Sequence, residues 1–166
     1  LKEQFREFCG FSEEEGARAV EYYREYYRDK GIFENEVYDG IPELLQELKA
    51  AGLKVIMATS KPETFAVTIA EHFGISRYFD FIGGSLMDGS RTKKSEVIEY
   101  VLDAAGVEER STVLMIGDRD YDILGAKEAG VHSMGVLYGY GSREELMAAG
   151  ADFIVEEPQD ALRYIV

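Results

Sequence analysis

The sequence predicts an α/β fold, in which a parallel β-sheet is flanked by helices and is preceded by a helical segment. Two observations predict this class. Apolar runs of strand length alternate with amphipathic helical patterns from Leu53 to the end of the chain. The apolar runs are continuous, which is typical of strands that are buried on both faces. We therefore expect ligand sites at the carboxyl ends of the strands, where parallel sheets place them.

Length and composition narrow the class of protein further. The 166 residues suit one domain with or without a small appendage, and 46% hydrophobic residues are enough for a core. The net charge of −14 argues against nucleic acid or an anionic membrane as partner. No run has the length of a membrane span, no signal-peptide pattern opens the chain, and Cys9 is the only cysteine. These features predict a cytoplasmic protein without a disulfide between its own cysteines.

The first thirty-odd residues have a helical pattern. Ser12 is a plausible N-cap followed by glutamates, and Gly31 can end the helix. Tyrosines form a stripe on this helix, at Tyr22, Tyr23, Tyr26 and Tyr27. Such a stripe can line a substrate pocket, but more often it packs one helix on another, and we favour packing. The composition changes near 34–40, which predicts a helical part over 1–36 and an α/β part over 37–166.

The α/β part divides into alternating elements. Each helix pattern has an apolar face, and most patterns end at glycine. Pro62 suits the first turn of its helix, because proline lacks the N–H that such a turn leaves unpaired. Strands are expected over 53–59, 78–84, 111–118, 131–139 and 152–157. Helices are expected over 40–52, 62–74, 95–106, 120–130, 143–150 and 158–166.

Two of the expected strand ends carry groups that suit phosphate. Thr59 and Ser60 end a strand just before a helix, where hydroxyl and backbone N–H groups can bind a phosphate group. Lys93 and Lys94 precede another helix in an otherwise acidic chain, and a lysine there can neutralise a phosphoryl group. Taken singly, each pattern is more often an ordinary helix cap or a solvated surface charge.

A third strand end carries two carboxylates, Asp118 and Asp122, directly after Gly117. They repel each other unless a cation lies nearby, and oxygen ligands of this kind suit Mg²⁺. An EF-hand calcium loop is rejected, because Ile123 and Ala129 stand where that loop needs glycine and glutamate. Helix capping with compensation of the helix dipole is the alternative. For the pair of aspartates we favour metal binding.

The order Thr/Ser, then Lys, then Gly-Asp-x-x-x-Asp, each at a strand end, is more specific than any single pattern. The chain resembles the haloacid dehalogenase superfamily of phosphatases, in particular its phosphoglycolate phosphatase-like branch with a small helical cap. The resemblance covers essentially the whole chain. It is carried by "VYDGIPELLQELKAAGLKVIMATSKP", "DGSRTKKSEVI", "VLMIGDRDYDILGAKEAG" and "GVLYGYGSREEL".

The resemblance implies a haloacid dehalogenase-like, Rossmann-like parallel sheet flanked by helices, with residues 1–36 as part of a helical cap. It also implies roles for individual residues. Thr59 looks like the phosphate-binding and catalytic hydroxyl, with Ser60 beside it in the phosphate site. Lys94 looks like the catalytic and phosphate-binding lysine, and Lys93 stays open as the alternative. Asp118 and Asp122 look like the ligands of a Mg²⁺ cofactor.

The family's first motif, Asp-x-Asp-Gly-Thr, does not occur in this chain. "MDGS" at 87–90 has one aspartate and follows a different strand. The family places the strand of this motif between those that end here at Thr59 and Asp118. We expect one of three situations: a segment that is present but outside this sequence, a segment that was cut yet stays bound, or a sheet closed over the gap. The first is favoured, and residues 1–166 by themselves are expected to be inactive.

The resemblance implies a Mg²⁺-dependent phosphatase that hydrolyses a small phosphate monoester through an aspartyl-phosphate intermediate. The expected partner is a small phosphorylated metabolite. The alternatives are a non-catalytic binding protein or fragment of this fold, and a phosphotransferase or mutase. Phosphoglycolate, a nucleotide monophosphate and pyrophosphate all stay open as substrates, and the oligomeric state is not predicted.

Overall fold

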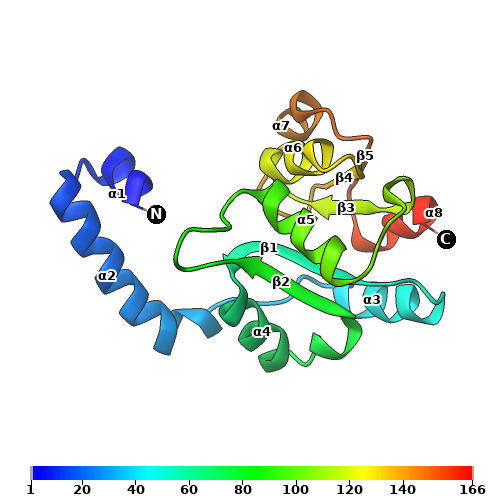
Figure 1. The fold of residues 1–166 in the computed structure, drawn as a ribbon, viewed down its shortest axis with the longest axis horizontal. Coiled ribbons are helices and arrows are strands. Elements are labelled where there is room, and N and C mark those ends of the chain that lie inside the picture. The colour runs from blue at the N-terminus through cyan, green and yellow to red at the C-terminus, as the bar shows by residue number, and fades with distance from the viewer. Residues whose placement is uncertain (1, 166) are drawn as a thin grey trace. The chain divides into compact units, whose positions relative to one another are not determined.

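A computed structural model describes residues 2–165, and the chain divides into two compact units, Leu1–Glu36 and Val37–Val166. The first unit is helical and consists of α1 (Lys2–Cys9), α2 (Glu13–Asp29) and the 3-10 helix η1 (Gly31–Phe33) (Figure 1). The predicted N-cap is confirmed, because the Ser12 side chain accepts the Glu15 N–H and the Glu15 carboxylate accepts the Ser12 N–H. The helical pattern is interrupted at Gly10, whose φ is 68°.

The tyrosine stripe takes part in packing inside the first unit. The Tyr23 ring lies 6.4 Å from the Phe5 ring of α1 in an edge-to-face arrangement, and 5.4 Å from the Tyr27 ring. The Tyr26 hydroxyl donates to the Glu34 carboxylate. The interpretation that the stripe packs helix against helix therefore holds for Tyr23.

Over residues 37–165 the second unit has five strands, and every pairing between them is parallel. The strands are β1 (Ile56–Pro62), β2 (Phe81–Ser85), β3 (Leu114–Gly117), β4 (His132–Val136) and β5 (Phe153–Val155). They form two sheets, of order β1-β2 and β3-β4-β5, in place of the single sheet that we expected. The α/β class with parallel strands is confirmed, but the sheet is in two pieces.

Helices cover both sheets, and helices α4 and α5 pack on β1 and β2 from opposite sides while α6 packs on β3 and β4 (Figure 1). The helices of this unit are α3 (Ile41–Ala50), α4 (Glu63–His72), η2 (Ser76–Tyr78), α5 (Lys94–Ala104), η3 (Arg110–Thr112), α6 (Asp120–Glu128), α7 (Arg143–Ala149), η4 (Pro158–Ala161) and α8 (Leu162–Ile165). The helix expected over 158–166 is thus divided into η4 and α8, and Val166 lies outside the described residues. Between residues 2 and 165, no helix combines the length and apolarity that a membrane span requires.

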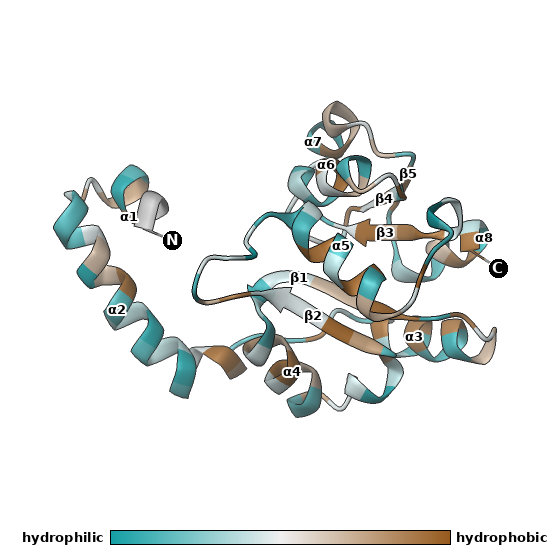
Figure 2. Cartoon of the chain, in the orientation of Figure 1, coloured by the Kyte–Doolittle hydropathy of each residue, from teal (hydrophilic) through white to brown (hydrophobic). Residues whose placement is uncertain are grey.

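An apolar cavity of about 770 Å³ separates the two sheets. Within the described residues β1 pairs only with β2, and β3 only with β4, so each has one edge without a partner strand. The two strands and the helices α3 and α5 line the cavity with apolar side chains, among them Leu44, Leu48, Met57, Ile98, Leu114 and Ile116. Figure 2 shows the apolar residues of β3 and, interspersed with polar ones, those of α3 and α5. The alternative in which the sheet has closed over the gap is therefore wrong, and the favoured alternative, a segment outside this sequence, stays a prediction.

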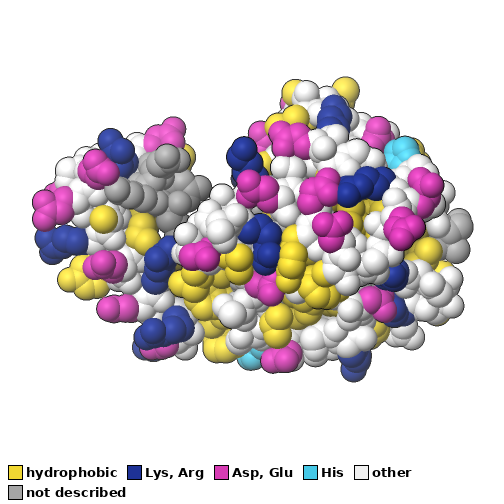
Figure 3. Space-filling model, in the orientation of Figure 1, with side chains coloured by type: hydrophobic (Ala, Val, Ile, Leu, Met, Phe, Trp, Pro, Cys, Tyr) yellow, Lys and Arg dark blue, Asp and Glu magenta, His cyan; other side chains and the backbone are white. Residues whose placement is uncertain are grey.

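The negative charge of the second unit is spread over its surface. Figure 3 shows acidic and basic side chains interspersed on the visible face, with hydrophobic side chains gathered where β1, β2 and α5 lie. Ion pairs such as Lys49–Asp80 and Arg143–Glu156 are exposed or half-exposed. Pairs of this kind contribute little to stability.

Candidate active site

The centre of the candidate site is a buried ion pair between Lys94 and Asp122. The Lys94 Nζ atom lies 2.8 Å from Asp122 Oδ1 and donates to the carbonyl oxygen of Ala58 over 3.0 Å. The two side chains are only 8% and 5% exposed. These contacts join β1 at Ala58, the first residue of α5 and the first turn of α6, so they bring together the three segments in which the sequence predicts site residues.

Two glycines make room for this pair. A Cβ atom on Gly117 would overlap the Asp122 side chain, and a Cβ atom on Gly125 would lie 2.6 Å from Cγ of Lys94. Any larger residue at either position would push the ion pair apart. No role was predicted for Gly125 from the sequence. Gly125 follows Asp122 by three residues on a helix, and this spacing places the two residues on one face.

The Asp122 carboxylate has both of its oxygen atoms engaged. While Oδ1 faces Lys94, Oδ2 accepts the backbone N–H groups of Asp118 and Arg119, each over 3.1 Å. The capping role, which was the alternative for this residue, is therefore part of what the side chain does. The prediction that Asp122 is a metal ligand stays a prediction, and a cation there would compete with Lys94 for the same carboxylate.

Asp118 lies in a more open environment, at the end of β3. It is half-buried, and its Oδ2 atom accepts the Tyr140 N–H over 2.8 Å. The carbonyl oxygen of Asp118 accepts the Gly141 N–H over 2.9 Å. A Cβ atom on Gly139 would overlap the Asp118 side chain, so the loop after β4 approaches closely only because glycine stands there. The other carboxylate oxygen of Asp118 has no partner among residues 2–165.

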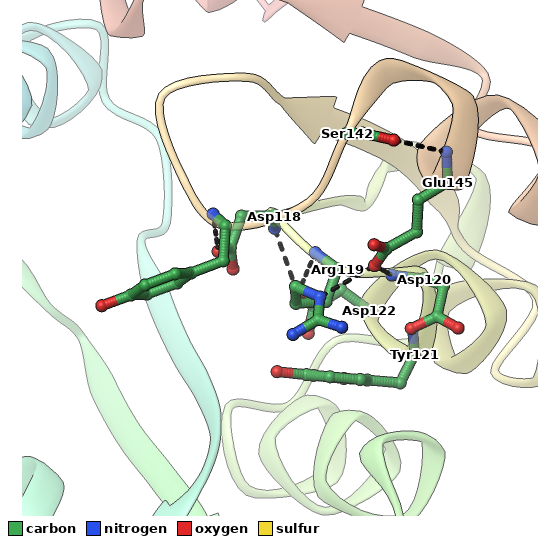
Figure 4. Close-up of polar contacts among 8 residues, drawn as sticks. Asp118, Arg119, Asp120, Tyr121, Asp122, Ser142 and Glu145 are labelled. Carbon is green, nitrogen blue, oxygen red and sulfur yellow. Dashed lines mark hydrogen bonds and ion pairs between the residues drawn. The ribbon is translucent and has the colours of Figure 1, made fainter.

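A second ion pair holds the segment that follows Asp118. One oxygen of the Glu145 carboxylate accepts Nε–H of Arg119 over 2.8 Å and the backbone N–H of Asp120 over 3.0 Å (Figure 4). The Ser142 hydroxyl accepts the Glu145 N–H and so caps α7. The sequence analysis missed Glu145. The Ser-x-x-Glu spacing signals a helix start, but not the contact with Arg119 and Asp120.

Thr59 and Ser60 lie in the middle of β1, directly after the residue that contacts the ion pair. Ala58, whose carbonyl oxygen binds Lys94, directly precedes Thr59. The Thr59 Oγ1 atom accepts the Lys61 N–H over 3.1 Å, and Ser60 is exposed. Helix α4 begins only at Glu63, so Thr59 and Ser60 lie in the strand, four and three residues before the helix, and do not lie directly before it as expected.

The structure separates the two neighbouring lysines. Lys94 is held inside the site, whereas the Lys93 side chain is exposed and its residue occupies the N-cap position of α5. The assignment of Lys94 as the functional lysine is still a prediction.

The acidic site also acts on a nearby tyrosine. Burial raises the pKa of the Tyr138 hydroxyl to about 12, and the negative charge of Asp118 contributes to this rise. The Tyr138 ring contacts Tyr38 edge to face at 5.6 Å and also lines the cavity between the sheets. Tyr138 therefore links the end of β4 to both the cavity and the candidate site.

The carboxylate oxygens of the site suit a hard cation that takes its remaining ligands from water and substrate. Within residues 2–165 no group of three or more His, Cys, Asp or Glu side chains could form a complete metal cage. Mg²⁺ characteristically uses one or two carboxylates together with water and substrate oxygen atoms. The unpartnered oxygen of Asp118 is a donor of the right kind, so the residues present fit this ion.

The sequence of the chain is similar to those of known hydrolases. A profile described as haloacid dehalogenase-like hydrolase matches residues 2–130. A 5'-nucleotidase from Pseudomonas aeruginosa is 48% identical over 148 residues, which are 89% of this chain and 66% of that protein. A phosphoglycolate phosphatase from Vibrio parahaemolyticus is 33% identical over 157 residues, which are 93% of this chain and 67% of that protein.

The fold agrees with these relatives. A crystal structure from Clostridium difficile, described provisionally as a phosphatase, matches with a TM-score of 0.93 and 47% identity, over 100% of this chain and 77% of that chain. The chain thus spans about two thirds of the length of these two curated relatives. Together with the matched profile, these similarities show that the chain belongs to the haloacid dehalogenase-like hydrolase family.

Proposed function

We propose that this chain is the larger part of a Mg²⁺-dependent phosphatase that hydrolyses small phosphate monoesters. The observation that carries the proposal is the juxtaposition of the buried Lys94–Asp122 pair, the end of β1 and the open carboxylate of Asp118. This places positive charge, hydroxyl groups and a free carboxylate oxygen at one edge of the strands, where a phosphate ester would need them.

Lys94 and Thr59 are proposed to hold the phosphoryl group. The Lys94 ammonium has three N–H donors, and its two contacts with Asp122 and Ala58 leave one for a phosphoryl oxygen. The Thr59 oxygen accepts the Lys61 N–H, so its own O–H can donate to a second oxygen. The exposed Ser60 can supply a further hydroxyl. These donors would offset the negative charge that develops on the phosphoryl oxygens during transfer.

The nucleophile is proposed to come from a strand outside residues 1–166. Its aspartate would attack phosphorus, the bond to the ester oxygen would break, and water would then hydrolyse the aspartyl-phosphate. The apolar cavity between β1 and β3 supports this proposal. A strand there would pair with both open edges and cover the apolar side chains, and its carboxyl end would lie beside Thr59 and Asp118.

Asp118 is proposed as the residue of this chain that binds Mg²⁺ directly. The bound ion would neutralise charge on the phosphoryl oxygens and on the attacking carboxylate. Asp122 would act mainly by holding Lys94 and the backbone of residues 118–119 in place. The helical unit 1–36 is proposed to belong to a cap, and the protein is proposed to work in the cytoplasm on small phosphorylated metabolites.

The substrate is proposed to be among the esters that the relatives' names suggest. One relative is named a 5'-nucleotidase and another a phosphoglycolate phosphatase. Nucleoside 5'-monophosphates and phosphoglycolate are therefore the first two substrates to compare. The intact mass of the natural protein should be measured first, because a value above the 18.7 kDa of these residues would reveal the additional segment.

The decisive experiment compares the natural full-length protein with its Asp118→Asn variant. Asparagine keeps an oxygen that can accept the Tyr140 N–H, so we expect the free energy of unfolding to change by less than about 0.5 kcal/mol. Release of inorganic phosphate with Mg²⁺ should fall by at least about a hundredfold. A wild-type rate in this variant would contradict the proposed role of Asp118. Absence of phosphate release from wild type with every ester tested would favour the non-catalytic alternative.

A further inference from the structure

We propose that Glu145 is the positioning residue of the site, which fixes the Asp118 carboxylate through Arg119, Asp120 and the loop 137–142. The proposal rests on the proposed function where it concerns Mg²⁺, but its structural part stands on the contacts alone. Glu145 lies 27 residues after Asp118, on α7, and its carboxylate binds the two residues that follow Asp118, namely Arg119 and Asp120.

Glu145 and Asp122 together hold the short segment 118–120. Its Oε1 atom accepts Nε–H of Arg119 and the backbone N–H of Asp120, at 2.8 and 3.0 Å. The backbone N–H groups of Asp118 and Arg119 donate to Asp122. The turn from β3 into α6 is thus held from one side by Asp122 and from the other side by Glu145 (Figure 4).

The same helix also anchors the loop that contacts Asp118. Ser142 ends this loop and caps α7 through the Glu145 N–H, so Glu145 contributes its backbone to the loop and its carboxylate to the turn. Two residues earlier in the loop, the Tyr140 N–H binds Oδ2 of Asp118, and the Gly141 N–H binds the Asp118 carbonyl. Glu145 therefore ties together the two backbone segments between which Asp118 lies.

The burial and hydrogen bonding of the Arg119–Glu145 ion pair favour a contribution of this pair to the order of the segment. The pair is only partly exposed, with 39% of the Arg119 side chain and 28% of the Glu145 side chain accessible. One carboxylate oxygen receives two charge-assisted hydrogen bonds, one of them from the backbone, which gives a defined geometry. Groups that orient a metal ligand from outside the ligand shell commonly change metal affinity by about tenfold or more when they are removed.

The test uses hydrogen exchange on the natural full-length protein and its variants Glu145→Ala, Glu145→Gln and Met147→Ala. We expect Glu145→Ala to lower the protection of the Tyr140 and Gly141 amides by about tenfold. Protection of amides in β2, which lies in the other sheet, reports global stability and should not change. Glu145→Gln keeps an acceptor oxygen and should restore part of the protection. Met147 is an exposed residue on the same helix, with 63% of its surface accessible, and Met147→Ala should behave like wild type.

A second measurement is the affinity for Mg²⁺ by calorimetry, which we expect Glu145→Ala to weaken by about tenfold. Unchanged protection of both amides in Glu145→Ala would overturn the proposal. So would faster exchange combined with unchanged Mg²⁺ affinity, because the segment would then be free to move without consequence for Asp118. If wild type binds no Mg²⁺, the proposed function fails separately, and the exchange data alone decide whether Glu145 has the positioning role.

Discussion

Two aspartates that are four residues apart belong to regions of opposite character. In the buried pair, Asp122 is 5% exposed, with one oxygen on Lys94 and the other on two backbone N–H groups. At the rim, formed by Asp118 and the loop 137–142, Asp118 is half-buried and uses one carboxylate oxygen for a single N–H. The comparison teaches that a carboxylate with all its partners supplied has a structural role, whereas one with an open oxygen is available for a ligand.

The largest effect on stability is expected from breaking the buried pair. Lys94→Met leaves the Asp122 carboxylate buried without its cation, which should lower the free energy of unfolding by about 3–5 kcal/mol. Urea denaturation measures this loss. The matched control is Lys93→Met, an exposed neighbour, which should change stability by less than about 0.5 kcal/mol. Equal losses in the two variants would contradict the assignment of Lys94 to the buried pair.

A double variant sharpens this test, because it also removes the negative charge of Asp122, which Lys94→Met leaves buried without a partner. In Lys94→Met/Asp122→Asn the amide oxygen can still accept the N–H groups of Asp118 and Arg119, and no charge stays buried. We expect it to be more stable than Lys94→Met alone, by urea denaturation under the same conditions. A double variant that is less stable than the single one would show that the cost of Lys94→Met arises elsewhere.

A smaller effect is expected at the rim. In Gly139→Ala the new methyl group overlaps the Asp118 side chain, so the loop or the aspartate must shift, at a cost of about 1–3 kcal/mol in thermal or urea unfolding. The control is Tyr140→Ala, because the 86% exposed Tyr140 side chain can be removed while its N–H still binds Asp118. Wild-type stability of both variants would contradict the close approach of Gly139 to the Asp118 side chain.

The smallest effect is expected from Tyr138, and only at high pH. Its pKa of about 12 lies above that of an unfolded tyrosine, about 10. The neutral hydroxyl therefore supports the folded state fully below pH 10, and this contribution is lost as the pH rises from about 10 to 12. Tyr138→Phe should flatten the fall of unfolding free energy over that interval, measured by urea denaturation at several pH values, while Tyr140→Phe should not. The same slope in Tyr138→Phe as in wild type would argue against the raised pKa.

Most elements of the fold could be predicted from local patterns. The helix that begins after Ser12, the parallel strands and the helices between them appear within a few residues of the expected places. The strand ends were less accurate: β1 starts at Ile56 and continues to Pro62, where a strand over 53–59 was expected. Strand bounds depend on where a partner strand begins and ends, and that partner is distant in sequence.

The candidate site was predictable in its residue types and only partly in its contacts. The glycine before Asp118 and the spacing to Asp122 indicated that both lie at the end of a strand and the start of a helix. Which of two adjacent lysines turns inward depends on the exact start of α5, and the local pattern left this open. Glu145 could not be found at all, because its partners lie about 25 residues away on another helix.

The sequence by itself determined the α/β alternation, the helix starts and the set of polar residues at the strand ends, because these follow from periodicity and capping within a few residues. Only the tertiary structure decided that Asp122 is saturated while Asp118 keeps an open oxygen, and that a cavity divides the strands into two sheets. The reason is physical: burial, ion pairing and strand pairing depend on atoms brought together from distant segments, and local sequence does not specify which of them will meet.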